Sequence, residues 1–148
     1  MKISNLVISK AASKDYPRIA DLLEAASLPV DGTEAVMSDM LVLKVSDRIV
    51  GCAALESYGT SALLRSVAVD GDHRHIGWGS ALVRAILDLA RTMGIQEIYL
   101  LTETAPTFFE RHGFQIVRRD DFAEPVKNSR EFSLICPRSA VAMKLRLS

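Results

Sequence analysis

The chain has 148 residues, 49% of them apolar and 24% charged, which is the balance of an ordinary globular protein with a single domain. Lys and Arg together number 18, as do Asp and Glu, so no basic excess points to nucleic acid or to an anionic membrane surface. No apolar run approaches the length of a membrane span, and we expect a cytoplasmic protein.

The cysteines and histidines indicate neither a disulfide framework nor a metal site. Cys52 and Cys136 lie far apart, and Cys52 falls in the apolar run 49–55, which predicts a core thiol. The three histidines lack the spacing with cysteines or carboxylates that a metal site needs. We therefore expect no bound metal.

The N-terminal third predicts a strand and two helices. The apolar run 6–8 indicates a short strand. Apolar residues then recur at helical spacing over 14–26, with Ser13 as the N-cap and Pro17 in the first turn. A second short helix is expected over 33–39.

The middle of the chain predicts a β-meander followed by a long helix. Three β-rich runs are joined by short turns: 41–45, 49–56 and 62–69. Turns this short join antiparallel neighbours. A polar, glycine-bearing loop over 71–79 then leads into a helical pattern over 79–93, which ends at Gly94.

The C-terminal third predicts three more strands and one helix. A helix connects the strand 62–69 to a buried strand at 98–101, so these two strands should be parallel. Thr104 is expected to cap a helix that runs to His112 and closes at Gly113. Two further runs indicate a final strand pair, 114–117 and 140–147. The predicted order is β-α-α-β-β-β-α-β-α-β-β, an α/β fold with a mixed sheet in one domain over 1–148.

The segment from Arg74 to Ser80 carries the clearest chemical signal. Backbone N–H groups of such a strand-to-helix loop converge where the helix N-terminus adds about half a positive charge. Gly77 and Gly79 let the backbone approach a ligand closely, and Arg74 can add a charge-assisted contact. A phosphate or pyrophosphate fits this arrangement, and so does an ordinary loop that caps a helix. The loop matches neither the Walker pattern nor the dinucleotide fingerprint.

Two motifs resemble those of the GNAT superfamily of N-acetyltransferases. Val67-Ala68-Val69 followed by Arg74-His75-Ile76-Gly77-Trp78-Gly79 resembles the family's acetyl-CoA signature, Q/R-x-x-G-x-G/A. The segment 105–114 is similar to its A-x-x-F-Y-x-x-x-G-F helix. Both motifs occur in the family's order, and the resemblance covers roughly residues 5–147.

The resemblance implies a GNAT-like fold whose parallel strands splay apart to admit acetyl-CoA as co-substrate. The pantetheine arm would pair with the main chain of 67–69, and the pyrophosphate would lie on the N–H groups of 76–80. An N–H near Val67 would stabilise the oxyanion while an amine attacks the thioester directly in a ternary complex. The cofactor-binding residues so implied are Val67, Ala68, Val69, Arg74, His75, Ile76, Gly77, Trp78, Gly79, Ser80, Thr102 and Phe109.

Two positions depart from the family pattern. His75 stands where many members have glycine, at a position that the signature leaves free. Phe109 stands where the family often has a tyrosine that protonates the departing thiolate, and phenylalanine cannot donate a proton. A thiol whose pKa is about 8.5 gives a tolerable leaving group, so the loss of that acid need not abolish turnover, and the general acid is left unassigned.

A finer resemblance concerns the substrate. The strand 62–69 is similar to the L-R-S-L-A-V strand of short N-acetylglutamate synthase-like enzymes. It also resembles the arsenic-resistance N-acetyltransferases, which act on glutamate-like amino acids such as arsinothricin. The tail 129–143 is similar to the R-E-F-x-x-x-C-P-x-S-A-x-x-M tail of that group. This resemblance implies a small glutamate-like amino acid as the amine substrate, and a homodimer.

The substrate-binding candidates are Arg65, Ser66 and Arg130. The planar guanidinium of Arg65, in an otherwise apolar strand, can hold a carboxylate bidentately; the alternative is an outward-facing arginine. Arg130 is a second anion clamp or a solvated loop charge. Glu56 is the candidate base for the amine proton, with a plain surface carboxylate as the alternative.

Two other functions stay open. One is a GNAT enzyme that acetylates protein N-termini or lysines. The other is a non-catalytic acyl-CoA-binding sensor, which Phe109 would suit. A structural α/β domain without a nucleotide would require both motifs to be coincidences.

Overall fold

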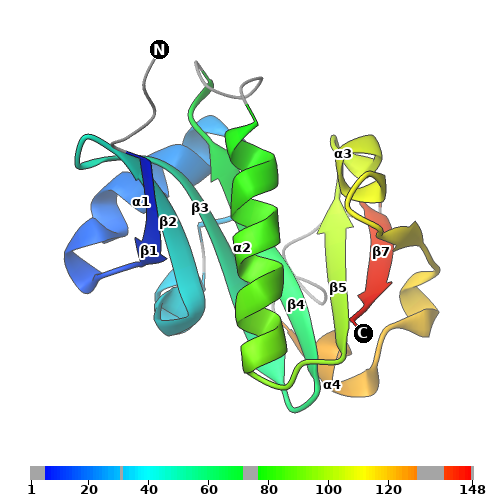
Figure 1. The fold of residues 1–148 in the computed structure, drawn as a ribbon. Helices are drawn as coiled ribbons and strands as arrows, with labels where there is room; N and C mark the ends of the chain where they lie inside the picture. Colours follow the sequence, from blue (N-terminus) through cyan, green and yellow to red (C-terminus); the bar gives the residue numbers. More distant parts are fainter. Residues whose placement is uncertain (1–5, 31, 72–76, 130–138, 148) are drawn as a thin grey trace. The chain divides into compact units, whose positions relative to one another are not determined.

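The computed structural model describes residues 6–30, 32–71, 77–129 and 139–147 (Figure 1). The chain forms two compact units. Unit 1 consists of Met1–Leu55 and Ser66–Asp88, and unit 2 of Glu56–Arg65 and Leu89–Ser148. Two strands and one helix contribute residues to both units.

Unit 1 contains the N-terminal strands and the helices that cover them. Its elements are β1 (Leu6–Lys10), a 3-10 turn (Ser13–Asp15), α1 (Tyr16–Ala25), a 3-10 helix (Thr33–Asp39), β2 (Met40–Val45), most of β3 (Arg48–Tyr58), the end of β4 (Ser61–Val69) and most of α2 (Trp78–Thr92). β1 pairs antiparallel with β2, and β2 with β3. The predicted strands, the short helix at 33–39 and the long helix ending at Gly94 are confirmed, with small shifts at their ends.

The first helix begins differently from the prediction. Ser13 is not its N-cap but the first residue of the 3-10 turn, and α1 begins at Tyr16. The Asp15 carboxylate accepts a hydrogen bond from the Ala12 N–H at 2.8 Å. Asp15 is the N-cap of α1, but its side chain makes no capping hydrogen bond to that helix and instead closes the preceding 3-10 turn. Pro17 lies in the first turn, as predicted.

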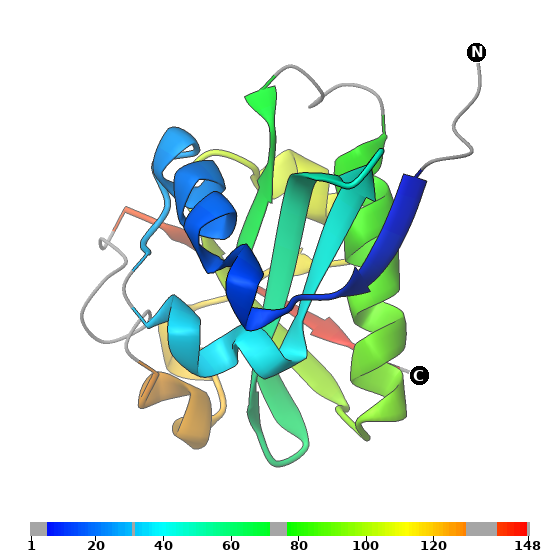
Figure 2. The same ribbon diagram turned by 90° about the vertical axis from the view of Figure 1, so that its left-hand side faces the viewer.

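α1 and α2 cover opposite faces of the unit 1 strands (Figures 1 and 2). On the α1 side lies one cluster of buried residues: Ile19, Leu22, Leu23, Val36, Met40, Val42, Ile49, Cys52, Ala54 and Ala68. On the other side, Gly51 admits α2 closely, since a Cβ there would lie 2.7 Å from Leu82 Cδ1. Successive strand residues thus face opposite helices, as the strand period requires.

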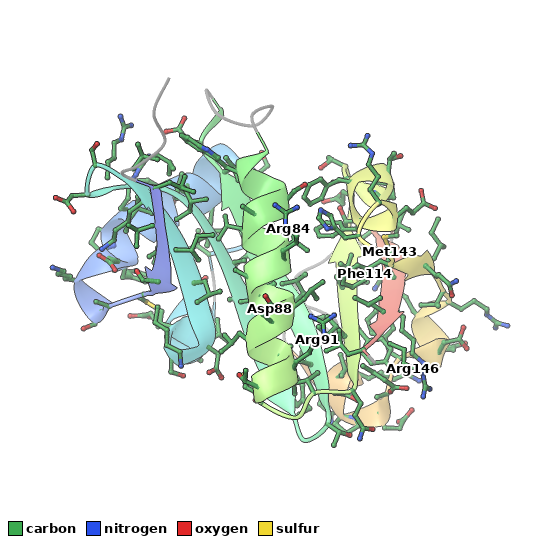
Figure 3. All side chains as sticks on the ribbon, viewed as in Figure 1. Arg84, Asp88, Arg91, Phe114, Met143 and Arg146 are labelled. Carbon is green, nitrogen blue, oxygen red and sulfur yellow. The ribbon has the colours of Figure 1, made fainter. Side chains whose placement is uncertain are left out.

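Arg84 and Asp88 lie on the exposed face of α2 (Figure 3).

Unit 2 contains the parallel strand pair and the C-terminal hairpin. Its elements, besides the ends of β3 and α2 and the start of β4, are β5 (Glu97–Thr102), α3 (Pro106–Glu110), β6 (Gln115–Ile116), a 3-10 turn (Arg119–Asp121), α4 (Glu124–Lys127) and β7 (Val141–Arg146). β4 and β5 are parallel, as predicted, and β7 pairs antiparallel with β5 and β6. The helical turns over 119–127 were not predicted, and β6 is shorter than the predicted run 114–117.

The parallel pairing of β4 with β5 is short. Among the described residues it runs from Ser61 opposite Glu97 to Leu63 opposite Tyr99. Both strands continue beyond these pairs, β4 to Val69 and β5 to Thr102. Beside them, a buried cluster holds unit 2 together: Leu63, Tyr99, Phe122, Val126 and Ala142.

The start of α3 corrects a second prediction. Thr104 does not cap this helix, whose N-cap is Ala105 and whose first residue is Pro106. The residue before a proline avoids the helical conformation, and Ala105 has φ −130° and ψ 37°. Its N–H donates instead to Thr102 Oγ1 at 3.1 Å. The helix ends at Glu110 and is followed by Gly113, whose φ is 94°.

The strands hydrogen-bond in the order β1-β2-β3-β4-β5-β7-β6. A seven-stranded mixed sheet, with an antiparallel meander followed by one parallel pair, is the fold class that the sequence predicted. Within the described ranges, no helix is long and apolar enough to cross a membrane.

Candidate functional site

The backbone of β4 is irregular at Ser66. Its φ is 60°, in the left-handed region, which costs a residue other than glycine about 1–2 kcal/mol. Ser66 is also buried. Such conformations persist only where the surroundings hold them, and they cluster at functional sites. The left-handed residue redirects the peptide group that joins it to Val67, which is the group implied in oxyanion binding.

Cys52 on β3 contacts this irregular residue. Its Sγ donates a hydrogen bond to the Ser66 carbonyl oxygen at 3.2 Å, and its side chain is buried. Burial raises the pKa of the Cys52 thiol to about 12, although a hydrogen bond with the Ala68 backbone acts in the opposite direction. The thiol is therefore neutral at physiological pH and a poor nucleophile. The prediction of a core cysteine is confirmed.

The N-terminus of α2 has the geometry of an anion site. Gly77 has φ 83° and accepts the first hydrogen bond of the helix from the Ala81 N–H. A Cβ at Gly77 would meet no atom of the described residues within 4 Å. The first turn carries no acidic residue, so nothing there opposes the positive end of the helix. Trp78, Gly79 and Ser80 form this turn and are half-buried.

Four predicted site residues lie outside the described residues: Arg74, His75, Ile76 and Arg130. The predicted main-chain segment Val67–Val69 forms the end of β4, and Ala68 is its most buried residue. The Ser66–Val67 peptide, the end of β4 and the first turns of α2 all belong to unit 1.

A charge cluster that the sequence did not reveal fixes the end of β4. Asp70 pairs with Arg18 at 3.1 Å and with Arg48 at 3.5 Å. Arg18 also donates from Nε to the Ile49 carbonyl, and the Asp70 N–H donates to Val50. The two guanidinium groups compensate the Asp70 carboxylate, which would otherwise repel an anion bound beyond the strand end. These residues come from three segments that lie far apart in the sequence, so no sequence motif predicts that they cluster.

In unit 2, Arg65 and Glu56 face each other across β4 and β3. Arg65 Nη1 lies 3.2 Å from Glu56 Oε1, and only 2% of the Arg65 side chain is exposed. The outward-facing alternative for Arg65 is therefore wrong. The Tyr58 hydroxyl donates to Glu56 Oε2, so both carboxylate oxygens are engaged.

Tyr58 is a site neighbour that the sequence analysis missed. Burial, and then the hydrogen bond to Glu56, raise the pKa of Tyr58 above its ordinary value, so the hydroxyl stays protonated. Its position was readable from the sequence, because residues two apart in a strand share one face. Tyr58 and Glu56 are such a pair at the end of β3.

Thr102 and Phe109, two further predicted cofactor residues, have structural contacts in unit 2. The Thr102 hydroxyl accepts the Ala105 N–H at the start of α3. The Phe109 ring is buried and packs edge-on against Phe114 and Phe108, at centroid distances of 5.7 and 5.0 Å. Within the described part of the chain, no group of three or more His, Cys, Asp or Glu side chains is placed to hold a metal ion.

Comparison with known proteins relates this chain to one family. A family model described as an acetyltransferase (GNAT) domain matches residues 37–116, more than half of the chain. The amino-acid acetyltransferase of Mycobacterium tuberculosis is 33% identical over 120 residues, which are 73% of this chain and 67% of that protein. That of Neisseria meningitidis serogroup A is 29% identical over 126 residues, 79% of this chain.

One solved structure adds bound ligands to the comparison. The N-acetylglutamate synthase of Neisseria gonorrhoeae, complexed with coenzyme A and N-acetyl-glutamate, is similar with a TM-score of 0.82 and 27% identity. The match covers 97% of this chain and 35% of that one. This chain thus spans only 29% of the Neisseria meningitidis protein and 35% of the Neisseria gonorrhoeae chain.

The anion site at α2 generates a prediction about Gly77. An alanine at φ 83° is strained by about 1–2 kcal/mol, so Gly77→Ala should let the loop relax and weaken coenzyme A binding about fivefold or more. Titration calorimetry measures the Kd. Gly71→Ala is the matched control, since a Cβ there meets open space without positive φ. Equal Kd values for the two variants would contradict the assignment.

Proposed function

Because the chain belongs to the GNAT acetyltransferase family, we propose that it transfers the acetyl group of acetyl-CoA to the amine of a small glutamate-like amino acid. We propose further that residues 1–148 act as one acetyltransferase domain. The observation that carries the proposal is that two consecutive residues of β4 each have an unusual feature that suits acetyl transfer. Arg65 supplies a buried guanidinium, and the next residue, Ser66, supplies the left-handed turn of the backbone.

The cofactor half of the proposal rests on unit 1. The main chain of Val67–Val69 pairs with the pantetheine arm, and the N–H groups of the first turn of α2 bind the pyrophosphate. A fifteen-residue helix whose first turn lacks acidic residues suits this role. Arg74, His75 and Ile76 contribute further contacts in the proposal, as do Thr102 and Phe109.

The substrate half rests on Arg65. A glutamate-like amino acid carries two acidic groups, and a planar guanidinium binds a carboxylate with two parallel hydrogen bonds. The Arg65 guanidinium is 2% exposed and pairs with Glu56, so in this proposal the substrate carboxylate is the second anion that it holds. Ser66, the next residue in the chain, is a further substrate contact in the proposal, and Arg130 provides the second anion clamp.

The reaction needs one base and one oxyanion donor. Glu56 accepts a proton from the substrate ammonium, and the freed nitrogen lone pair attacks the thioester carbonyl carbon. The carbonyl π electrons move to oxygen, where the Val67 N–H stabilises the charge. The nitrogen of the intermediate loses its second proton to solvent, and the intermediate then collapses: the C=O bond re-forms and the C–S bond breaks, giving the N-acetyl amino acid and the CoA thiolate. Phe109 supplies no proton to it, and protonation from solvent suffices for a thiol whose ordinary pKa is about 8.5.

The finer assignments rest on the resemblance in the strand 62–69 and the tail 129–143. On that resemblance the substrate is glutamate or one of its analogues phosphinothricin and arsinothricin. The protein works in the cytoplasm as a homodimer in this proposal. The amino-acid acetyltransferase relatives support the coarser assignment, acetyl transfer to an amino acid.

The proposal predicts which amines release free thiol from acetyl-CoA. Glutamate, aspartate, glutamine, phosphinothricin and arsinothricin are compared with polyamines, aminoglycosides and a peptide that carries a free N-terminus and a lysine. Turnover confined to glutamate-like amino acids, with acetylated products identified by mass, is the expected result. Turnover of the peptide alone would make the protein a protein acetyltransferase. Bound coenzyme A without any thiol release would make it a sensor.

Arg65→Ala should raise the KM for the amino acid about tenfold or more and leave the KM for acetyl-CoA within about twofold. A hydrogen bond to a charged group contributes about 1.5–3 kcal/mol, which corresponds to this range. Steady-state kinetics with each substrate varied gives both constants. Arg146→Ala, which removes an arginine that is 74% exposed and pairs with Glu97, is the control. Equal, small changes in both constants would refute the role of Arg65.

Glu56→Gln should lower kcat about a hundredfold, the lower end of the effect of a general base. The residual rate should follow the free-amine fraction and so rise steadily with pH up to the pKa of the amine. The measurement is the pH profile of kcat/KM. Glu124→Gln, at an exposed carboxylate of the same unit that pairs with Lys127, serves as the control. An unaltered rate and profile in Glu56→Gln would remove Glu56 as the base.

A further inference from the structure

A hydrogen bond joins Cys52 to the Ser66 carbonyl in the proposed acetyl site. Its Sγ lies 3.2 Å from the Ser66 carbonyl oxygen, and its side chain is 0% exposed. It belongs to the buried cluster on the α1 side of unit 1. This cluster also contains Ala68, which lies on β4 as Ser66 does. The thiol of Cys52 on β3 thus contacts β4 at Ser66, the residue with the left-handed backbone.

The Ser66 carbonyl and the Val67 N–H belong to the same peptide group. A peptide group is planar, and in its trans form the C=O and N–H bonds point in opposite directions. A donor that holds the carbonyl oxygen of Ser66 therefore also fixes the direction of the Val67 N–H. With the carbonyl turned toward Cys52, the N–H points away from the Cys52 side chain.

From this geometry we infer that Cys52 is a positioning residue for acetyl transfer. Its S–H···O=C bond holds the Ser66–Val67 peptide so that the Val67 N–H faces the thioester carbonyl oxygen. The inference rests on the proposed function, which places that oxygen at Val67. Cys52 itself touches neither the cofactor nor the substrate.

The chemistry of Cys52 fits this role. Burial keeps the thiol protonated, so it is a donor at the pH of turnover. An oxyanion donor acts only when it points at the position where the charge develops, and the loss of one such donor lowers kcat about a hundred- to a thousandfold. A peptide group that is merely misaligned should lose less than that. The left-handed Ser66 makes misalignment easy, because other backbone conformations cost that residue less.

The test compares Cys52→Ala with Cys52→Ser, two variants that differ in one hydroxyl group. Cys52→Ala should lower kcat about tenfold or more, with the KM for acetyl-CoA and the Kd for coenzyme A within about threefold of wild type. Cys52→Ser keeps a donor at this position and should restore kcat to within about threefold. This split between kcat and cofactor affinity, with rescue by serine, is not expected from a general loss of stability.

Val42→Ala is the control for the cavity that a smaller side chain leaves. Val42 lies opposite Cys52 on β2, is buried in the same cluster, and takes no part in the bond to Ser66. Its truncation should lower the thermal unfolding midpoint and leave kcat near the wild-type value. If Cys52→Ala does not fold, Cys52→Val replaces it, since valine fills the space without a donor.

Each outcome decides the inference. Equal kcat values for wild type, Cys52→Ala and Cys52→Ser overturn it, as does an equal loss in both variants. If the wild-type protein releases no thiol with any amine, the proposed function fails. The inference is then judged by the affinity for acetyl-CoA relative to coenzyme A. Cys52→Ala should lower this ratio and Cys52→Ser should not; an unchanged ratio would overturn the inference as well.

Discussion

The left-handed backbone of Ser66 is the constraint on which the proposed chemistry depends. A regular strand would direct the peptide after Ser66 into the sheet, whereas a φ of 60° turns it elsewhere. The conformation is unfavourable for serine, so the neighbouring structure must maintain it. Cys52 holds the carbonyl on one side, and the ion pairs of Asp70 with Arg18 and Arg48 fix the end of the strand.

Charged residues in and around the proposed site are paired so that the positive end of α2 is not neutralised and the buried Arg65 has a counter-ion. In unit 1, two guanidinium groups compensate Asp70, and the first turn of α2 carries no acid, so the positive end of the helix remains available to a pyrophosphate. In unit 2, Glu56 compensates the buried Arg65 and is itself held by the Tyr58 hydroxyl. A buried charge without such a partner would be costly, which explains why Arg65 and Glu56 occur together.

The sequence predicted the fold well where short-range patterns determine it. Apolar β-rich runs and short turns place β2 to β4, and Gly94 closes α2 as its position indicates. Both predicted caps were wrong, because a 3-10 turn that starts at Ser13 precedes α1 and because Ala105, not Thr104, precedes α3. The left-handed Ser66 and the cluster around Asp70 could not be predicted, since serine has no preference for that conformation and the cluster joins distant segments. Tyr58 could have been found from the strand period.

The central claim is that the Val67 N–H meets the acetyl oxygen, and the amide resonance of Val67 tests it most directly. In a ¹⁵N-labelled protein, saturation with acetyl-CoA and with coenzyme A is compared by two-dimensional NMR. The two ligands share every contact except the acetyl group. The account predicts a clearly larger change in the Val67 amide shift with acetyl-CoA than with coenzyme A. Identical shifts with both ligands, or no change with either, would contradict it.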